Sequence, residues 1–193
     1  MKRICVFCGS SPGANPVYRE AAALLGAALA ERSLGLVYGG ARLGLMGAVA
    51  DAALVAGGQV IGVIPGLLMG KEVAHEGLTE LRIVGSMHER KQTMADLSDG
   101  FIAMPGGFGT IEEITEILTW SQLGIHQKPC GLLNVHGYFD RLIGFLDHAV
   151  SERFLSPVNR AMIMIADTPG ELLSQFGRYR PQYVEKWLDR RAT

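Results

Sequence analysis

Two charged side chains are candidates for chemistry because helical geometry places each of them against apolar neighbours. The segment after residue 110 carries an apolar stripe at helical spacing, formed by Ile111, Ile114, Ile117 and Leu118. At about 100° per residue, Glu113 lies at the border of this stripe, whereas Glu112 points nearly the opposite way. We therefore expect Glu113 to be the shielded carboxylate, suited to stabilising a cation or transferring a proton.

Arg90 is the second candidate. The same projection over residues 87–97 places it within a stripe formed by Met87, Met94 and Leu97. An unpaired buried charge costs several kcal/mol, so Arg90 should meet a carboxylate, a helix end or a substrate phosphate. In the alternative interpretation, its stem lies on the apolar face and its guanidinium group reaches water.

Glycine-rich segments follow three of the apolar runs, at residues 9–13, 39–44 and 105–110. Glycine lets a backbone approach a ligand closely, and a helix that begins there directs N–H groups and a partial positive charge at an anion. In α/β sheets, ligands bind beyond the carboxyl ends of the strands, where such loops lie. The segments predict a phosphate site. In the alternative interpretation the glycines only form tight turns, and this alternative is stronger for the first two segments than for the third.

Several other kinds of site lack their residues in this sequence. A lysine P-loop is absent because Gly70-Lys71 is followed by Glu72 rather than by Ser or Thr. The dinucleotide pattern G-x-G-x-x-G does not follow the first strand, and no acid ends the second. There is no G-x-S-x-G elbow for a serine nucleophile, and the histidines have no shared metal spacing. We therefore expect neither covalent acyl chemistry nor a metal site.

Seven apolar, β-rich runs alternate with helix-length segments that must position these residues. The runs lie at 4–8, 36–38, 60–64, 81–84, 101–104, 130–135 and 162–165. Strands that are apolar almost throughout are buried on both faces, so this order predicts a doubly wound, Rossmann-like α/β domain with a parallel sheet and helices on both faces. We place this single domain at residues 1–180 and a tail of unassigned role at 181–193.

Local signals mark some of the helices and one long connection. Asn15 is a plausible N-cap with Pro16 at the first helical position, and a second helix at 45–55 is closed by Gly57-Gly58. Residues 65–80 form an irregular stretch longer than a normal connection, which makes it a candidate for binding or subunit contact.

Composition limits the class of protein. The chain has 193 residues, of which 48% are hydrophobic, and its 18 basic and 19 acidic residues leave a formal charge of −1. No apolar run approaches the roughly 20 residues that cross a bilayer, and we expect no leader, no membrane partner and a cytoplasmic location. Lys and Arg form no basic run, so we expect no nucleic-acid partner.

The cysteines are Cys5, Cys8 and Cys130. The C-x-x-C spacing of the first two is found in redox and zinc sites, but here it lies along an apparent strand and no second pair completes a metal site. An odd number of sparse cysteines fits a reducing compartment. We therefore interpret all three as buried structural residues.

Two runs together resemble the paired signature of the Lonely guy (LOG) family: M-H-E-R-K at 87–91 and P-G-G-F-G-T-I-E-E at 105–113. The likeness extends from C-G-S-S at 8–11 and Y-G-G at 38–40 to T-W-S-Q-L-G-I-H at 119–126 and G-L-L-N-V at 131–135. Members of this family are cytokinin riboside 5′-monophosphate phosphoribohydrolases, often mislabelled as lysine decarboxylases.

The resemblance implies a site, an assembly and the absence of a cofactor. Arg90 and Glu113 carry over as the catalytic pair. The residues implied around the substrate are Glu72, Arg90, Lys91, Gly106, Gly107, Phe108, Gly109, Thr110, Glu113 and Thr119. The family implies homodimers or assemblies of dimers. It places Lys91 beside a phosphate rather than in a Schiff base, which argues against pyridoxal-dependent lysine decarboxylation.

The expected reaction is hydrolysis of the N-glycosidic bond of adenosine 5′-monophosphate, with or without an N6 substituent, to a free base and ribose 5-phosphate. Such cleavage builds positive charge on the ribose, which Glu113 would stabilise while Arg90 positions the nucleotide. In the alternative, the protein carries a nucleotide or phosphorylated cofactor without cleaving it. A carrier of anions has no need for a shielded carboxylate, because like charges repel. A purely structural role is the least favoured.

Overall fold

The apolar runs pair as seven parallel strands in the computed structural model, which describes residues 1–69 and 73–181. The strands are β1 (Arg3–Phe7), β2 (Gly35–Tyr38), β3 (Val60–Pro65), β4 (Glu80–Val84), β5 (Gly100–Ala103), β6 (Cys130–Leu133) and β7 (Ile163–Ala166). Their order in the sheet is β4-β3-β2-β1-β5-β6-β7. The chain runs outward from β1 to β4 and then resumes on the other side of β1, so the switch point, where ligands bind in such sheets, lies between β1 and β5.

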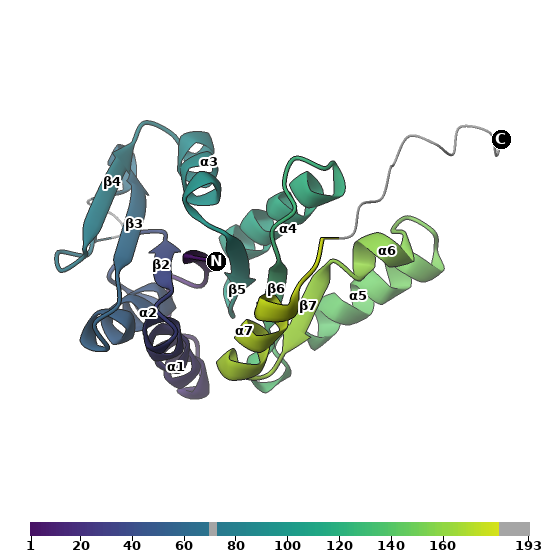
Figure 1. Ribbon diagram of the computed structural model, residues 1–193, viewed down its shortest axis with the longest axis horizontal. Helices are drawn as coiled ribbons and strands as arrows, with labels where there is room; N and C mark the ends of the chain where they lie inside the picture. Colours follow the sequence, from purple (N-terminus) through teal and green to yellow (C-terminus); the bar gives the residue numbers. More distant parts are fainter. Residues whose placement is uncertain (70–72, 182–193) are drawn as a thin grey trace.

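Helices cover both faces of the sheet (Figure 1). They are α1 (Val17–Glu31), α2 (Gly44–Val55), α3 (Met87–Leu97), α4 (Phe108–Gln122), α5 (Asp140–Ser151), α6 (Pro157–Arg160) and α7 (Pro169–Arg178), with 3₁₀ turns at Gly66–Leu68 and Val135–Gly137. Side chains of α1, α2 and α7 share one buried core. Those of α3, α4 and α5 pack on the core of the opposite face. The predicted doubly wound architecture is confirmed.

The predicted bounds of the strands and of the first two helices agree with the structure to within a few residues. Helix α1 begins at Val17 with Pro16 at the N-cap position, one residue later than predicted, although the Asn15 side chain accepts a hydrogen bond from the Val17 N–H at 3.1 Å. Helix α2 is followed by Gly57, whose φ of +78° is the left-handed conformation that glycine supplies at helix ends. The last described helix ends at Arg178. Nearly all of the tail placed at 181–193 lies outside the described residues.

The long connection after β3 folds back on the second glycine-rich loop. The Arg42 N–H donates to the Val73 carbonyl at 2.9 Å, and the His75 N–H donates to the Gly40 carbonyl at 3.0 Å. Ala41 and Ala74 form an isolated antiparallel bridge between these two hydrogen bonds. The described part of this connection therefore supports the loop after β2.

All three cysteines are free and buried, as expected. Burial raises the pKa of the Cys130 thiol to about 12. Burial also raises the pKa of Cys5 and of Cys8, and the Glu113 carboxylate raises both further. Because the thiolate is the reactive and metal-binding form, these raised pKa values agree with a structural role.

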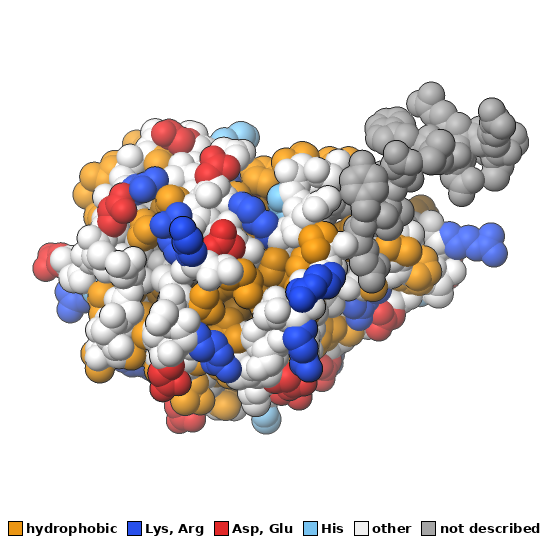
Figure 2. Space-filling model, viewed as in Figure 1, with side chains coloured by type: hydrophobic (Ala, Val, Ile, Leu, Met, Phe, Trp, Pro, Cys, Tyr) orange, Lys and Arg blue, Asp and Glu red, His pale blue; other side chains and the backbone are white. Residues whose placement is uncertain are grey.

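The surface carries both signs of charge. On the face drawn in Figure 2, Lys and Arg side chains lie interspersed with Asp and Glu. None of the described helices is both long enough and apolar enough to cross a bilayer. The absence of a nucleic-acid partner stays a prediction.

Candidate active site

The three glycine-rich loops meet at the carboxyl edge of β1, β2 and β5. The Gly9 N–H donates to the Pro105 carbonyl at 3.0 Å, which ties the first loop to the third. The second loop approaches the first as closely, because a Cβ on Gly44 would lie 2.3 Å from the Ser10 carbonyl carbon. Gly44 also has a φ of +63°, which favours glycine. Convergence of the loops therefore requires glycine here, beyond what separate tight turns would need.

The third loop opens helix α4, where the first N–H groups have no partner within the helix and carry a partial positive charge. Thr110 is 3% exposed, and a Cβ on Gly106 would lie 2.1 Å from its Oγ1 atom, so internal packing explains this glycine. A Cβ on Gly107 or Gly109 would meet no atom within 4 Å. The packing of the fold therefore does not require glycine at these two positions. The lack of a side chain there instead lets a ligand approach the backbone closely. Phe108, between them, is 97% exposed.

Arg90 reaches the second loop from helix α3, which Ser86 caps by accepting the Glu89 N–H at 3.1 Å. The Arg90 side chain is only 5% exposed, and its Nη2 atom donates to the Gly39 carbonyl at 3.0 Å. A Cβ on Gly39 would lie 2.1 Å from that nitrogen, so the contact depends on glycine. The predicted burial of Arg90 is confirmed, but the partner in this hydrogen bond is a main-chain carbonyl at a strand end, which is not among the three partners predicted for Arg90.

Glu113 is partly buried whereas Glu112 is exposed, as the helical projection predicts. The Glu113 carboxylate and the Arg90 guanidinium group both act on the buried Cys5 thiol. After burial, Glu113 is the next cause that raises the Cys5 pKa, while Arg90 lowers it. The two opposite charges therefore lie within electrostatic reach of one point beneath the loops.

Lys91 links helix α3 to helix α4. Its Nζ atom makes ion pairs with Glu112 and, at 3.0 Å, with Glu116. Burial lowers the Lys91 pKa, but hydrogen bonds and charge from the two carboxylates outweigh burial and raise it. Because Lys91 follows Arg90 and Glu112 precedes Glu113, this link fixes the two helices next to the residues predicted to be catalytic. A contact of Lys91 with a nucleotide stays a prediction.

One predicted substrate-binding residue, Thr119, does not join the loops. Thr119 is exposed near the end of α4, about 14 Å from Thr110 at 1.5 Å per helical residue, and its hydroxyl donates to the Thr115 carbonyl at 2.8 Å. Glu72 lies outside the described residues. Within one chain, therefore, Thr119 is separate from the third glycine-rich loop.

The sequence analysis did not single out Tyr138, which contacts the third loop. Its hydroxyl donates to the Gly106 carbonyl at 2.6 Å, and its ring packs edge-on against Tyr18 at 5.6 Å. Tyr138 follows β6, whose carboxyl end lies at the same edge of the sheet as those of β1 and β5. That position was the only sequence signal that could have suggested it.

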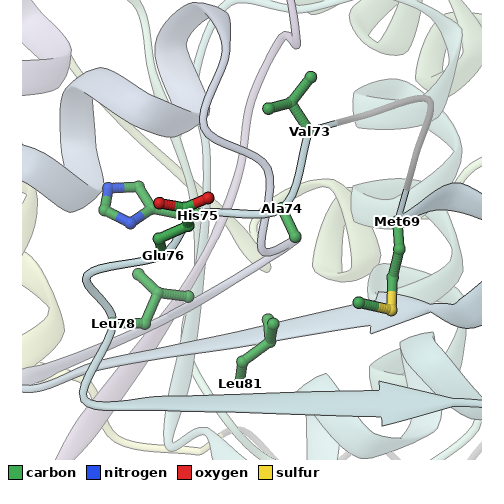
Figure 3. Close-up of a pocket in the computed structure, with 7 residues that line it drawn as sticks. All are labelled: Met69, Val73, Ala74, His75, Glu76, Leu78 and Leu81. Carbon is green, nitrogen blue, oxygen red and sulfur yellow. The ribbon is translucent and has the colours of Figure 1, made fainter.

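A pocket of about 610 Å³ has none of Arg90, Lys91 and Glu113 in its lining (Figure 3). It is lined by Met69, Val73, Ala74, His75, Glu76, Leu78 and Leu81. The His75 imidazole points towards α2, where its Nε2 atom lies 2.8 Å from Asp51, and its Nδ1 atom accepts the Gly77 N–H at 3.0 Å. Leu78 packs on the core shared with α1 and α2. The pocket therefore lies on the opposite face of the sheet from α3 and α4.

The sheet and its loops define the class: a doubly wound α/β protein, in which ligands generally bind at the carboxyl ends of the strands. A family model described as possible lysine decarboxylase matches residues 46–176. The chain belongs to this family, and within it to the LOG group, because its close relatives are LOG proteins.

Two of these relatives come from plants. Cytokinin riboside 5′-monophosphate phosphoribohydrolase LOG7 of Arabidopsis thaliana is 52% identical over 184 residues, covering 95% of this chain and 85% of the relative. The probable phosphoribohydrolase LOGL9 of Oryza sativa subsp. japonica is 54% identical over 180 residues, covering 93% and 79%.

Solved structures share the fold at lower identity. TM1055 superposes with a TM-score of 0.72 at 22% identity, over 93% of this chain and all of that one. The molybdenum cofactor carrier protein of Chlamydomonas reinhardtii gives a TM-score of 0.69 at 21% identity, over 92% and 96%. At these identities the likeness shows the fold alone.

Proposed function

We propose that this protein hydrolyses the N-glycosidic bond of N6-substituted adenosine 5′-monophosphates and releases a cytokinin base and ribose 5-phosphate. The observation that carries the proposal is half identity, over more than nine-tenths of the chain, to phosphoribohydrolases of that substrate class. The convergence of the glycine-rich loops near Arg90 and Glu113 supports it. AMP presents the same ribose phosphate and is the second substrate we propose.

In the proposed reaction, water adds to C1′ of the ribose as the bond from C1′ to the base nitrogen breaks. The water oxygen becomes the new C1′ hydroxyl, and one water proton ends on the base. The ribose becomes cationic before the new bond is complete. Glu113 stabilises that charge and orients or deprotonates the water. The scheme uses no metal and no organic cofactor.

The remaining residues bind and orient the nucleotide. The loop from Gly106 to Thr110 holds the 5′-phosphate at the start of α4, and Arg90 positions the nucleotide and stabilises charge on the leaving base. Phosphate binding then supplies energy that orients the reacting bond. Lys91, Glu72 and Thr119 complete the set that we assign to the substrate.

We also propose that the protein is a homodimer or an assembly of dimers. Support comes from the apolar surface formed by the end of α4 with α5 and α6. Large side chains exposed there include Leu123, Ile125, Phe145, Phe154 and Val158, and exposed apolar patches of this kind mark interfaces. Thr119 lines a groove of about 130 Å³ on this surface, so a second copy of the chain is what could bring Thr119 to a nucleotide.

The compartment that we propose is the cytoplasm. Three free, buried cysteines fit this reducing compartment.

The proposal is tested by incubating pure protein with AMP and, separately, with isopentenyladenosine monophosphate. The expected products are free base and ribose 5-phosphate in equal amounts, and the ratio of the two rates identifies the preferred base. Adenosine is the matched control because it lacks only the phosphate. Binding of both nucleotides without any product would instead indicate a carrier, and equal rates on adenosine and AMP would contradict the role of the phosphate.

A further inference from the structure

The loop between β6 and α5 is a fourth element of the site. His136 has a φ of +53° and Gly137 a φ of +69°. A left-handed conformation at a residue other than glycine costs free energy and persists only where the surroundings fix it. Here Asn134, only 7% exposed, fixes the loop: its side chain accepts the Phe139 N–H at 2.7 Å and donates to Asp140 at 2.8 Å. The loop is thus held in one shape.

This shape places Tyr138 against the third glycine-rich loop. Its ring makes edge-on contacts with Tyr18 at 5.6 Å and with Phe139 at 5.1 Å, which hold the ring in place. Its hydroxyl donates to the Gly106 carbonyl at 2.6 Å. Because 41% of Tyr138 is exposed, the contact lies at the mouth of the loops rather than in the core.

The Gly106 carbonyl belongs to the same rigid peptide unit as the Gly107 N–H. A trans peptide is planar, and its C=O and N–H groups point in opposite directions. The hydrogen bond from Tyr138 therefore sets the direction of the Gly107 N–H. Neither Gly106 nor Gly107 has a side chain that hinders rotation of this unit, so an external contact is needed to fix it.

We propose that Tyr138 is a positioning residue for the 5′-phosphate: its hydroxyl orients the peptide between Gly106 and Gly107, so that the Gly107 N–H faces the anion. This inference rests on the proposed function, because it assumes that a phosphate ester binds at the start of α4. It adds Tyr138, and the loop that carries it, to the residues assigned above.

The test compares Tyr138→Phe with Tyr18→Phe by isothermal titration of ribose 5-phosphate and, with Glu113→Gln added to every protein so that AMP is not hydrolysed, of AMP. The first variant keeps the ring and removes the hydroxyl that holds Gly106. The second removes a hydroxyl from the other ring of the same edge-on pair. We expect Tyr138→Phe to weaken both ligands by about fivefold, the loss of one hydrogen bond, while Tyr18→Phe leaves both affinities within about twofold of wild type. Unfolding temperatures of both variants should stay near that of the wild type.

Each other outcome overturns the inference. Unchanged affinities in Tyr138→Phe would show that the hydroxyl does not matter. A loss for AMP without a loss for ribose 5-phosphate would place the effect at the base, and equal losses in both variants would indicate general loosening of the aromatic pair. Hydrolysis of AMP, measured separately, keeps the two proposals distinct. If the wild type hydrolyses AMP and Tyr138→Phe binds both ligands as tightly as the wild type does, only the role of Tyr138 is excluded. If only Tyr138→Phe weakens binding and the wild type does not hydrolyse AMP, only the enzymatic function is excluded.

Discussion

Arg90 and Gly39 lie 51 positions apart in the sequence, and the guanidinium Nη2 atom of the first donates to the carbonyl of the second at 3.0 Å. The hydrogen bond joins helix α3 to the end of β2 and holds a buried cation at the edge of the loops. It gives Arg90 a structural role beside the catalytic role that we propose.

Arg90→Lys separates charge from geometry. Lysine keeps the positive charge but lacks the planar, multiply donating guanidinium group. We expect turnover of AMP to fall by about tenfold or more, and the free energy of unfolding to fall by about 1 kcal/mol. Arg19→Lys, at an exposed position on α1, is the control and should change neither quantity. Steady-state kinetics and urea denaturation provide the measurements, and full turnover in Arg90→Lys would contradict a role for the guanidinium geometry.

Glu113→Gln keeps the size of the side chain and removes its charge. Because the ribose becomes cationic during cleavage, we expect kcat for AMP to fall by about 100-fold or more while nucleotide binding persists. The neighbouring Glu112→Gln is the matched control. It weakens only an exposed ion pair with Lys91, which typically contributes about 0–1 kcal/mol, and its kcat should stay within about twofold of wild type. Full activity in Glu113→Gln would remove Glu113 from the mechanism.

Gly107→Ala tests whether glycine at position 107 is needed for ligand binding, and Gly106→Ala tests whether glycine at position 106 is needed for the packing of the fold. A Cβ at position 107 meets no protein atom within 4 Å, so stability should be unchanged while the Kd for AMP rises by about tenfold. A Cβ at position 106 would lie 2.1 Å from Thr110 Oγ1, and we expect a loss of about 2 kcal/mol in unfolding free energy. Thermal unfolding distinguishes the two, together with titration calorimetry on proteins that also carry Glu113→Gln, so that AMP is bound but not hydrolysed. Unchanged AMP affinity in Gly107→Ala would place the phosphate elsewhere.

Phe145→Glu tests the proposed dimer. Phe145 is 62% exposed on α5, so a charged side chain there should leave the fold of one chain intact while opposing association through that surface. Leu24→Glu is a matched control because Leu24 is also 62% exposed but lies on α1, which packs on the opposite face of the sheet. We expect the mass from light scattering to fall from two chains to one only in Phe145→Glu. A dimer that survives this change would exclude the surface.

His126 makes stability depend on pH. Its Nε2 atom lies 2.9 Å from the Ile117 carbonyl, and its Nδ1 atom accepts the Lys128 N–H, an arrangement that needs the neutral ring. Burial is the largest cause that lowers the His126 pKa, the Lys128 charge lowers it further, and the Ile117 carbonyl partly opposes them.

The unfolded state therefore binds a proton at His126 more readily than the folded state does. This contribution to stability is fully present above the unfolded pKa of about 6.5 and is lost as the pH falls from there towards the folded pKa. We expect wild type to lose more unfolding free energy between pH 7.5 and pH 5.5 than His126→Gln, with urea denaturation at both values as the measurement. Equal losses would show that His126 stays uncharged or is equally protonated in both states.

Periodicity predicted those parts of the site that depend on a single helix. The buried position of Arg90 and the difference between Glu112 and Glu113 follow from residues within two turns of each. The Gly39 contact could not be predicted in this way, because it joins two elements whose approach depends on the whole sheet. For the same reason the hydroxyl of Tyr138, 32 positions from Gly106, left no local pattern. The sheet itself was predictable because every strand except the edge strand β4 is apolar almost throughout.

The resemblance to a family named site residues without placing them. Thr119 belongs to the implied set, yet the structure puts it near the far end of α4 from Thr110. Lys91 was expected beside a phosphate. In the structure it makes ion pairs with Glu112 and Glu116, which depend on the packing of α3 against α4. A motif specifies which residue types recur, whereas their neighbours are set by tertiary packing.

The missing side chain at position 39 has a consequence for how this enzyme family can be redesigned. The space that a Cβ at position 39 would fill is occupied by the guanidinium group of residue 90, so the two positions share one volume. Mutant libraries that diversify either position alone will be dominated by clashes or voids. Productive variants should appear only when both codons are randomised together, with a smaller group at 90 compensating for a larger one at 39.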